Sequence, residues 1–432
     1  MIQAALQKVN VTPPIGTPLG GYAARKSVSQ GIHDDLYATA MLLQREKDAL
    51  VIVTADLIGF PREVVEQIRK AAQKYANIPP TNVLIAASHT HSGPDLLFGH
   101  QGLASRAYVE VLIENIVGAI YATQKKLHPV EIGVGQGRLE GLGVNRRTST
   151  GVPIDPSTGV LRVDCNKKPE GILINYTCHP VVLGPDNLLI TADYPGYALR
   201  MIERVLEGKV IPMFTNGAAG DINVGHSAEL SAIGEKIPGR TFERAEKLGL
   251  MLAGEVLKTL AKIESSQEVL IATASKDVFL PLKPLPSLEE VKALVQDKEK
   301  ALNELVQKGA SAELVAKAKI EKLYADILFQ QVNERQQKPK ELNPVELQAI
   351  RIGNCALITF PGELFVEIGL KIKEQSPFQY TYVIGYANGY VGYLPTKQAF
   401  EEGGYEAVAS HFAPESEEIV IEESLALLRS LV

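Results

Sequence analysis

The chain has 432 residues, of which 45% are hydrophobic and 22% charged, so it can bury a large core and is longer than one minimal domain needs. A formal net charge of -6, with no segment that concentrates lysine or arginine, argues against a nucleic-acid partner. No apolar run could form a transmembrane segment, the amino terminus has no apolar signal region, and the three cysteines match no metal or redox spacing. We therefore expect a globular, cytoplasmic protein with reduced cysteines.

The first part of the chain predicts strands that alternate with a helix. A segment rich in Gly and Pro at 11–35 contains His33, a candidate site residue. Apolar patterns then predict strands at 36–43, 49–55 and 82–86, and a helix at 62–75. The second strand ends on Asp56. A strand, helix, strand order with polar residues at the carboxyl ends of the strands indicates an α/β core with a parallel component.

Two histidines, His89 and His91, directly follow the strand at 82–86. The carboxyl end of a strand is where α/β folds place their chemistry. Side chains at i and i+2 point the same way in an extended backbone, which suits a shared metal, or one ligand beside one substrate contact. A hydrogen-bonded turn with two ordinary histidines is the alternative at this point.

The middle of the chain repeats this arrangement. The patterns predict helices at 106–125 and from 191–197 to about 207, and strands at 131–137, 159–164, 171–178 and 210–214, with a hairpin turn at 166–170. The strand at 171–178 is followed by His179 and Pro180, so a histidine again stands at a strand end. Arg146, in a loop that begins with glycine, could clamp a carboxylate or phosphate, or could be a solvated loop arginine.

A loop of small residues at 216–226 follows the strand at 210–214. Its backbone amides could approach a ligand closely and act as anion or oxyanion donors. Because it lacks the spacing of a Walker loop or a dinucleotide fingerprint, we reject nucleotide binding here.

Residues 283–342 predict an inserted helical hairpin. From 286 to about 338 the composition shifts to Lys, Glu, Gln, Ala and Leu, with a break at 308–311 and strands expected on both sides at 268–280 and 345–352. A solvated or self-packing insertion is one interpretation. A dimer contact, giving a homo-oligomer, or a lid over the site is the other.

The last part of the chain adds a carboxylate to the histidines. A buried strand at 355–360 is followed by Glu363 and a helix at 364–373, and a strand at 380–386 by Ala387 to Thr396. Neutral imidazoles plus a carboxylate are a common ligand set of catalytic zinc, and they leave room for a bound water.

Five blocks of sequence, in order, resemble the neutral (non-lysosomal) ceramidases over nearly the whole chain. The blocks are Ser88-His89-Thr90-His91-Ser92-Gly93-Pro94, Cys178-His179-Pro180, Gly217-Ala218-Ala219-Gly220-Asp221, Pro361-Gly362-Glu363 and Ala387-Asn388-Gly389-Tyr390-Val391-Gly392-Tyr393. The resemblance implies one ceramidase-like catalytic domain over residues 1–432, with the hairpin inside it and without the carboxyl-terminal immunoglobulin-like domain of longer members. The fold expected is α/β, with a mixed, partly parallel sheet core and surrounding helices.

The resemblance also implies roles for individual residues. It implies that zinc is held by His89, His179, Glu363 and Tyr393. It further implies that His91, Arg146 and Tyr405 contact the substrate or stabilise the tetrahedral intermediate.

Other residues can be placed around such a site. Asn223 stands where the ceramidases carry a serine, and its amide can donate and accept hydrogen bonds but cannot be a nucleophile. Asp56, Asp193, Asp221 and His33 are candidate partners behind the metal-binding histidines. Helix capping and turn formation explain the three aspartates equally well.

We therefore expect zinc-dependent hydrolysis of an amide bond in an N-acyl substrate, either a ceramide-like lipid or a smaller molecule, by metal-activated water. A metallohydrolase of esters or phosphoesters, and a non-catalytic binding protein that retains the pocket, are the alternatives. Amidohydrolase barrels also use a His-x-His motif, but on their first strand, whereas two strands are expected before it here.

Overall fold

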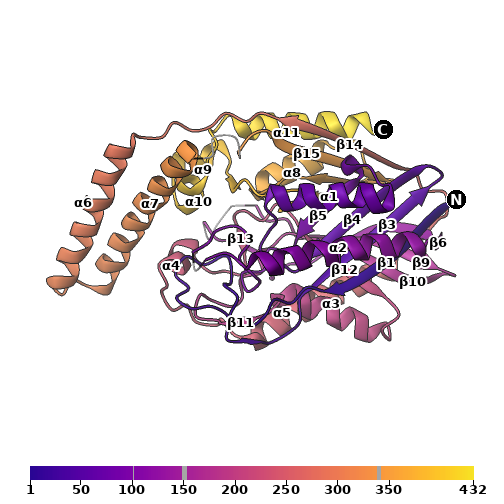
Figure 1. The fold of residues 1–432 in the computed structure, drawn as a ribbon, viewed down its shortest axis with the longest axis horizontal. Coiled ribbons are helices and arrows are strands. Elements are labelled where there is room, and N and C mark those ends of the chain that lie inside the picture. Colours follow the sequence, from indigo (N-terminus) through magenta and orange to yellow (C-terminus); the bar gives the residue numbers. More distant parts are fainter. Residues whose placement is uncertain (101, 148–152, 338–341) are drawn as a thin grey trace.

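The computed structural model describes residues 1–100, 102–147, 153–337 and 342–432, whose longer strands form three mixed sheets (Figure 1). The first sheet, in the order β5-β4-β3-β1-β6, contains β1 (Ile2–Asn10), β3 (Tyr37–Arg45), β4 (Asp48–Ala55), β5 (Val83–Ala87) and β6 (His128–Pro129). The second, β12-β10-β9-β7, contains β7 (Glu131–Arg138), β9 (Ser157–Cys165), β10 (Lys168–Tyr176) and β12 (Ile211–Asn216). The third, β14-β15-β16-β18, contains β14 (Ile271–Val278), β15 (Val345–Ile352), β16 (Cys355–Thr359) and β18 (Tyr380–Ile384).

The three sheets repeat one pattern of connections. In each, three successive strands pair antiparallel and a fourth pairs parallel with the third: β5 with β4, β12 with β10, and β18 with β16. A crossover helix precedes each parallel strand, as a parallel connection requires. These helices are α1 (Arg62–Ala76), α3 (Asp193–Val205) and α8 (Val366–Gln375). We call each set of four strands and its helices a unit.

A second helix in each unit covers the antiparallel strands. These helices are α2 (Arg106–Lys125) on β1 and β3, α5 (Phe242–Leu260) on β7 and β9, and α11 (Ser416–Ser430) on β14 and β15. The inner faces of all three sheets share one core, to which the units contribute Met41, Leu173 and Leu357, each fully buried. Truncating one such side chain to alanine typically costs about 2–5 kcal/mol.

Short elements follow the carboxyl ends of the long strands. They are β2 (Gly31–Ile32), β8 (Val144–Asn145), β11 (Leu189–Ile190), β13 (Ile222–Asn223), α4 (Ala228–Ala232), β17 (Glu363–Leu364), β19 (Tyr393–Leu394), α9 (Lys397–Glu402) and α10 (Tyr405–Ala409). The short helix η1 (Pro80–Asn82) instead precedes the amino end of β5. Figure 1 shows β13, α4 and α10 between the long strands and the projecting helices, on the side away from the two termini.

The expected α/β class with a mixed, partly parallel sheet is confirmed, although the strands form three sheets. Strand β1 was missed because Gln3, Gln7 and Lys8 interrupt its apolar pattern, yet it lies between β3 and β6. The turn expected at 166–170 is shorter, since Asn166 and Lys167 alone connect β9 to β10. Both have positive φ angles, 51° and 62°, as a tight hairpin turn requires.

Two long helices, α6 (Leu288–Gln307) and α7 (Ala312–Gln337), connect β14 to β15 and extend beyond the rest of the molecule (Figure 1). Helix α6 begins with a capping box, in which Ser287 and Glu290 each bind the other's backbone N–H. The predicted limits of the insertion, 283–342, include residues 338–341, which lie outside the described part of the chain. The single-domain assignment for 1–432 stays a prediction.

Among the helices of the described residues, none combines the length and the apolar character that crossing a bilayer demands.

Candidate metal centre

The candidate site lies where strands from all three units end. Unit one provides His89 after β5, unit two His179 after β10, and unit three Glu363 after β16. The buried Asn216, at the end of β12, joins the first two segments, because its Nδ2 donates to the carbonyl oxygens of Ser88 at 3.2 Å and Cys178 at 3.1 Å. A side chain of unit two thus holds the segment of unit one that leads to His89.

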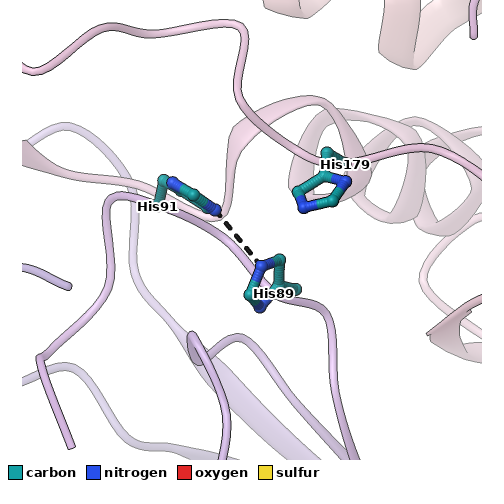
Figure 2. A group of neighbouring side chains, drawn as sticks. All are labelled: His89, His91 and His179. Atoms are coloured by element: carbon teal, nitrogen blue, oxygen red, sulfur yellow. Dashed lines mark hydrogen bonds between the residues drawn. The ribbon is translucent and has the colours of Figure 1, made fainter. Parts of the chain in front are cut away.

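Three imidazoles meet at this point (Figure 2). One ring nitrogen from each of His89, His91 and His179 lies within 4.8 Å of the others. The Nε2 atoms of His89 and His91 are 3.2 Å apart. His89 and His179 are fully buried, whereas His91 is half-buried. His89 has a φ angle of 69°, and this left-handed conformation turns the chain sharply between the two histidines.

A carboxylate completes the group. Glu363 Oε2 lies 2.8 Å from His179 Nε2 and 3.7 Å from His89 Nε2. Its other oxygen, Oε1, accepts a hydrogen bond from the hydroxyl of Tyr390 at 2.5 Å. The parallel ladder of β17 and β19 pairs Glu363 with Tyr393, which puts both side chains on the same face of the ladder.

Backbone carbonyls set the orientation of the two buried imidazoles. Nδ1 of His89 lies 2.6 Å from the Ile58 oxygen, and Nδ1 of His179 lies 3.1 Å from the Ile222 oxygen. A carbonyl only accepts, so each Nδ1 carries the hydrogen and each neutral ring presents a lone pair at Nε2. The lone pair of His179 then faces a carboxylate oxygen, an arrangement that needs a cation or a proton between the two atoms. Two imidazoles and a carboxylate fit a zinc ion with a position left open.

The protonation states suit a cation. Burial lowers the pKa of His89 to about 3 and lowers that of His91 well below its ordinary value. Burial alone would raise the pKa of Glu363, but His89, His179 and the Arg146 guanidinium outweigh it and lower the pKa to about 2. His89 is therefore neutral and Glu363 ionised over the physiological range, as metal binding requires.

Arg146, Tyr393 and Tyr405 form one wall of the centre. Arg146 is 5% exposed and donates to Glu406 Oε1 at 2.7 Å, to the Gly220 oxygen at 2.8 Å and to the Tyr393 hydroxyl at 3.1 Å. The rings of Tyr393 and Tyr405 meet edge to face with their centroids 6.0 Å apart. The structure therefore brings these three residues together, with Arg146 bound on several sides rather than solvated.

Asp56, Asp193, Asp221 and His33, the four side chains expected behind the histidines, have the following hydrogen bonds and ring contacts in the structure. Asp56 accepts from the Tyr37 amide at 2.9 Å, Asp193 from the Val182 amide at 3.1 Å, and Asp221 from the Val366 amide at 2.9 Å. They hold backbone segments next to the site. His33 stacks on Phe242 with ring centroids 3.8 Å apart and pairs with Asp34. The carbonyls of Ile58 and Ile222, rather than carboxylates, accept from the two ring Nδ1 atoms, and the Ile222 oxygen also accepts from the His179 amide at 2.9 Å.

Asn223 serves the loop that contains it. Its Oδ1 accepts from the amides of Gly225 at 2.8 Å and His226 at 3.1 Å, and its Nδ2 donates to the His226 oxygen at 2.7 Å. The side chain is 2% exposed. These bonds close a turn directly after β13, so the side-chain amide of Asn223 already has hydrogen-bond partners within its own loop.

Three further residues belong to the centre and were not singled out from the sequence. The ring of Tyr386 stacks on His89 with centroids 4.0 Å apart, Tyr390 binds Glu363, and Glu406 holds Arg146. Tyr390 stands in the sequence block that contains Tyr393, and Glu406 follows Tyr405, so proximity in sequence was an available signal for both.

A second group of metal-binding residue types lies elsewhere. His128, Cys165 and Glu170 are all half-buried, with one ligand atom of each within 4.8 Å of the others. His128 Nε2 lies 3.0 Å from Glu170 Oε2, as in an ordinary ion pair.

Fold and site together define an α/β protein with a candidate metal centre at the meeting point of its strands. The model of the neutral/alkaline non-lysosomal ceramidase amino-terminal domain matches residues 6–227, and the chain belongs to this family. The neutral ceramidase of Mycobacterium tuberculosis is 22% identical over 469 residues, which cover 91% of this chain and 71% of that protein. The neutral ceramidase of Pseudomonas aeruginosa is 23% identical over 461 residues, covering 91% of this chain and 66% of that protein.

Solved structures agree in fold. The crystal structure of the Pseudomonas aeruginosa neutral ceramidase aligns with a TM-score of 0.76 at 22% identity, over 100% of this chain and 74% of that one. A ceramidase complexed with C2 aligns with a TM-score of 0.74 at 18% identity, over 100% of this chain and 75% of that one. The sequence-based assignment to the family is thereby confirmed.

Proposed function

We propose that the chain hydrolyses the amide bond of an N-acyl substrate, with a ceramide-like lipid as the first candidate. The reaction would take place at a zinc ion held by His89, His179 and Glu363, with Tyr393 as the fourth protein ligand. The observation that carries the proposal is the convergence of two buried imidazole Nε2 atoms and one carboxylate oxygen. Membership of the family supports it, since the relatives matched are named neutral ceramidases.

A zinc ion bound there would supply a Lewis acid and lower the pKa of a water molecule. His91 is half-buried and stands beside the proposed ligands, and its low pKa keeps the ring neutral. The neutral ring has a lone pair that can accept a proton from the attacking water, whose own pKa the ion would lower. As the carbon–nitrogen bond breaks, the same ring returns the proton to the departing amine.

Tyr405 and Arg146 would stabilise the charge that develops on the carbonyl oxygen. Burial raises the pKa of Tyr405, so its phenol stays protonated and able to donate. Arg146 is held by Glu406 and the Gly220 oxygen, and its positive charge needs no reorganisation during the reaction. Donors fixed in advance are the most effective way to stabilise an oxyanion.

The test is turnover by the zinc-loaded protein on three substrate panels: long- and short-chain N-acyl amides including ceramides, carboxylic esters, and phosphoesters. We expect cleavage of amides that disappears in His89→Ala together with bound zinc. Cleavage of phosphoesters alone would replace the proposal with a phosphoesterase. Zinc binding without turnover on any panel would favour a binding protein.

A further inference from the structure

Each unit has one long connection at the end of its sheet that carries the candidate centre. These connections join β1 to β3, β7 to β9, and β14 to β15. The first reaches the centre through Arg25, which donates to the His91 oxygen at 2.7 Å, and the second through Arg146, which donates to the Tyr393 hydroxyl at 3.1 Å. The third contains the helical hairpin. Because this third connection occupies the equivalent position in its unit, the hairpin is also expected to contact residues near the centre.

Helix α7 binds the carboxyl end of the short helix α10. Gln331 is 3% exposed, and its Nε2 donates to the oxygens of Val408 at 3.1 Å, Ala409 at 2.8 Å and Ser410 at 3.1 Å. These carbonyls end α10 and have no partner within the helix. Because α10 has only 5 residues, it cannot be stable by itself and depends on such contacts.

Helix α7 also reaches the amino end of α10, through Glu229 of α4. The Tyr324 hydroxyl donates to Glu229 Oε1 at 3.3 Å, and the same oxygen accepts from the Tyr405 amide at 3.3 Å. Tyr324 of α7 is thus linked through Glu229 to Tyr405, the first residue of α10.

Helix α10 in turn carries residues of the centre. Tyr405 faces Tyr393, and Glu406, which is 1% exposed, accepts from Arg146 at 2.7 Å and Arg147 at 2.9 Å. At the other end of α10, Ser410 Oγ donates to the Tyr393 oxygen at 3.0 Å. A displacement of α10 would therefore move the proposed oxyanion donors together.

We propose that the base of the inserted hairpin is a positioning element of the catalytic site, in which Tyr324 and Gln331 hold α10 and thereby Tyr405, Glu406 and Arg146. In this assignment the hairpin is neither a lid nor a spacer. The tip of the hairpin, where Lys308 pairs with Glu304 at 3.6 Å, has no part in catalysis. The catalytic consequence rests on the proposed amide hydrolysis, whereas the positioning of α10 does not.

The experiment compares Tyr324→Phe and Gln331→Met with Lys308→Met, a control at the exposed tip of the same hairpin. Amide hydrogen exchange at residues 405–410 measures how firmly α10 is held, and steady-state kinetics on the best N-acyl substrate measure function. We expect both test variants to exchange faster at 405–410. We also expect kcat to fall about tenfold in Gln331→Met with KM changed less than about twofold, because the donors act in the transition state. The control should match the parent protein in both measurements.

A conservative pair adds a rescue test. Glu229→Gln keeps an oxygen that can accept from Tyr324 and Tyr405, so it should retain more turnover than Glu229→Leu. Unchanged exchange at 405–410 in Gln331→Met and Tyr324→Phe would overturn the positioning role, whatever the turnover. Faster exchange with unchanged kcat would overturn the link to catalysis. If the parent protein cleaves no amide, the proposed function fails, while the exchange data still decide whether α7 holds α10.

Discussion

The hydroxyl of Tyr390 donates to Glu363 Oε1 while Glu363 Oε2 faces His179 Nε2, so the two oxygens of this carboxylate have different tasks. One oxygen is fixed by a neighbouring phenol. The other oxygen, Oε2, faces His179 and is available to bind an ion. Partners of this kind orient metal-binding carboxylates and commonly change metal affinity about 10–100-fold when they are removed.

Tyr390→Phe should therefore weaken zinc binding about tenfold, because Glu363 loses the contact that fixes its orientation. Competition with a chromogenic chelator measures the affinity, with Tyr121→Phe, an exposed tyrosine of α2, as the matched control. Equal affinities in the two variants would show that the hydrogen bond does not orient the carboxylate.

His89 and His91 should respond differently to truncation. His89→Ala removes a proposed ligand, so both bound zinc and turnover should be lost. His91→Ala removes a proposed proton carrier, so zinc content should stay near the parent level while kcat falls about a hundredfold or more. Metal analysis of the purified variants, alongside kinetics, separates the two roles. Loss of zinc in His91→Ala would make His91 a ligand instead.

Asn223 should matter for stability. Asn223→Ala leaves the Gly225 and His226 amides without their acceptor, and we expect the free energy of unfolding to fall by about 1–3 kcal/mol in urea denaturation. Asn303→Ala, at an exposed position of α6, is the control and should change it by less than about 0.5 kcal/mol. Asn223→Ser, which introduces the serine of the ceramidases, should also destabilise the protein and should not raise turnover. A gain in turnover would contradict this view of Asn223.

Asp56 should make stability depend on pH. Burial raises the pKa of this carboxyl to about 7, whereas the unfolded chain releases the proton near pH 4. The unfolded state therefore loses its proton first, so the contribution of Asp56 to stability is full below about pH 4 and declines as the pH rises to about 7. In Asp56→Asn this decline should be absent.

Urea denaturation at several pH values between 4 and 7 measures the effect as a difference between parent and variant. Asp48→Asn, at the exposed start of the same strand, provides the control and should keep the parent's pH dependence. If Asp56→Asn and the parent lose stability equally over this range, Asp56 does not titrate as its burial implies.

Local sequence rules were sufficient for the strand ends that carry His89, His179 and Glu363. Each follows a short buried apolar strand, and the side chain after such a strand is placed by the strand itself. The hairpin helices were equally accessible, since their periodicity extends over many residues. Propensity and period decide such elements without knowledge of the rest of the fold.

The contacts that complete the centre depend on distant parts of the chain. Arg146 and Glu406 are 260 positions apart, and the Ile58 carbonyl meets a histidine 31 positions away. No local pattern encodes such pairs, and a carbonyl has no sequence signature at all. The expectation that aspartates stand behind the histidines was reasonable chemistry, but no sequence pattern indicates that the carbonyls of Ile58 and Ile222 lie there instead.

Because three units converge on one site, the site is complete only when all three units have folded and docked. Each unit supplies one of the buried groups His89, His179 and Glu363, and no unit holds two of them. A partly folded chain that lacks any one unit therefore offers an incomplete set, however native the other two have become. Native-like ion affinity should appear only with the last docking event, so an added ion would distinguish finished molecules from compact intermediates.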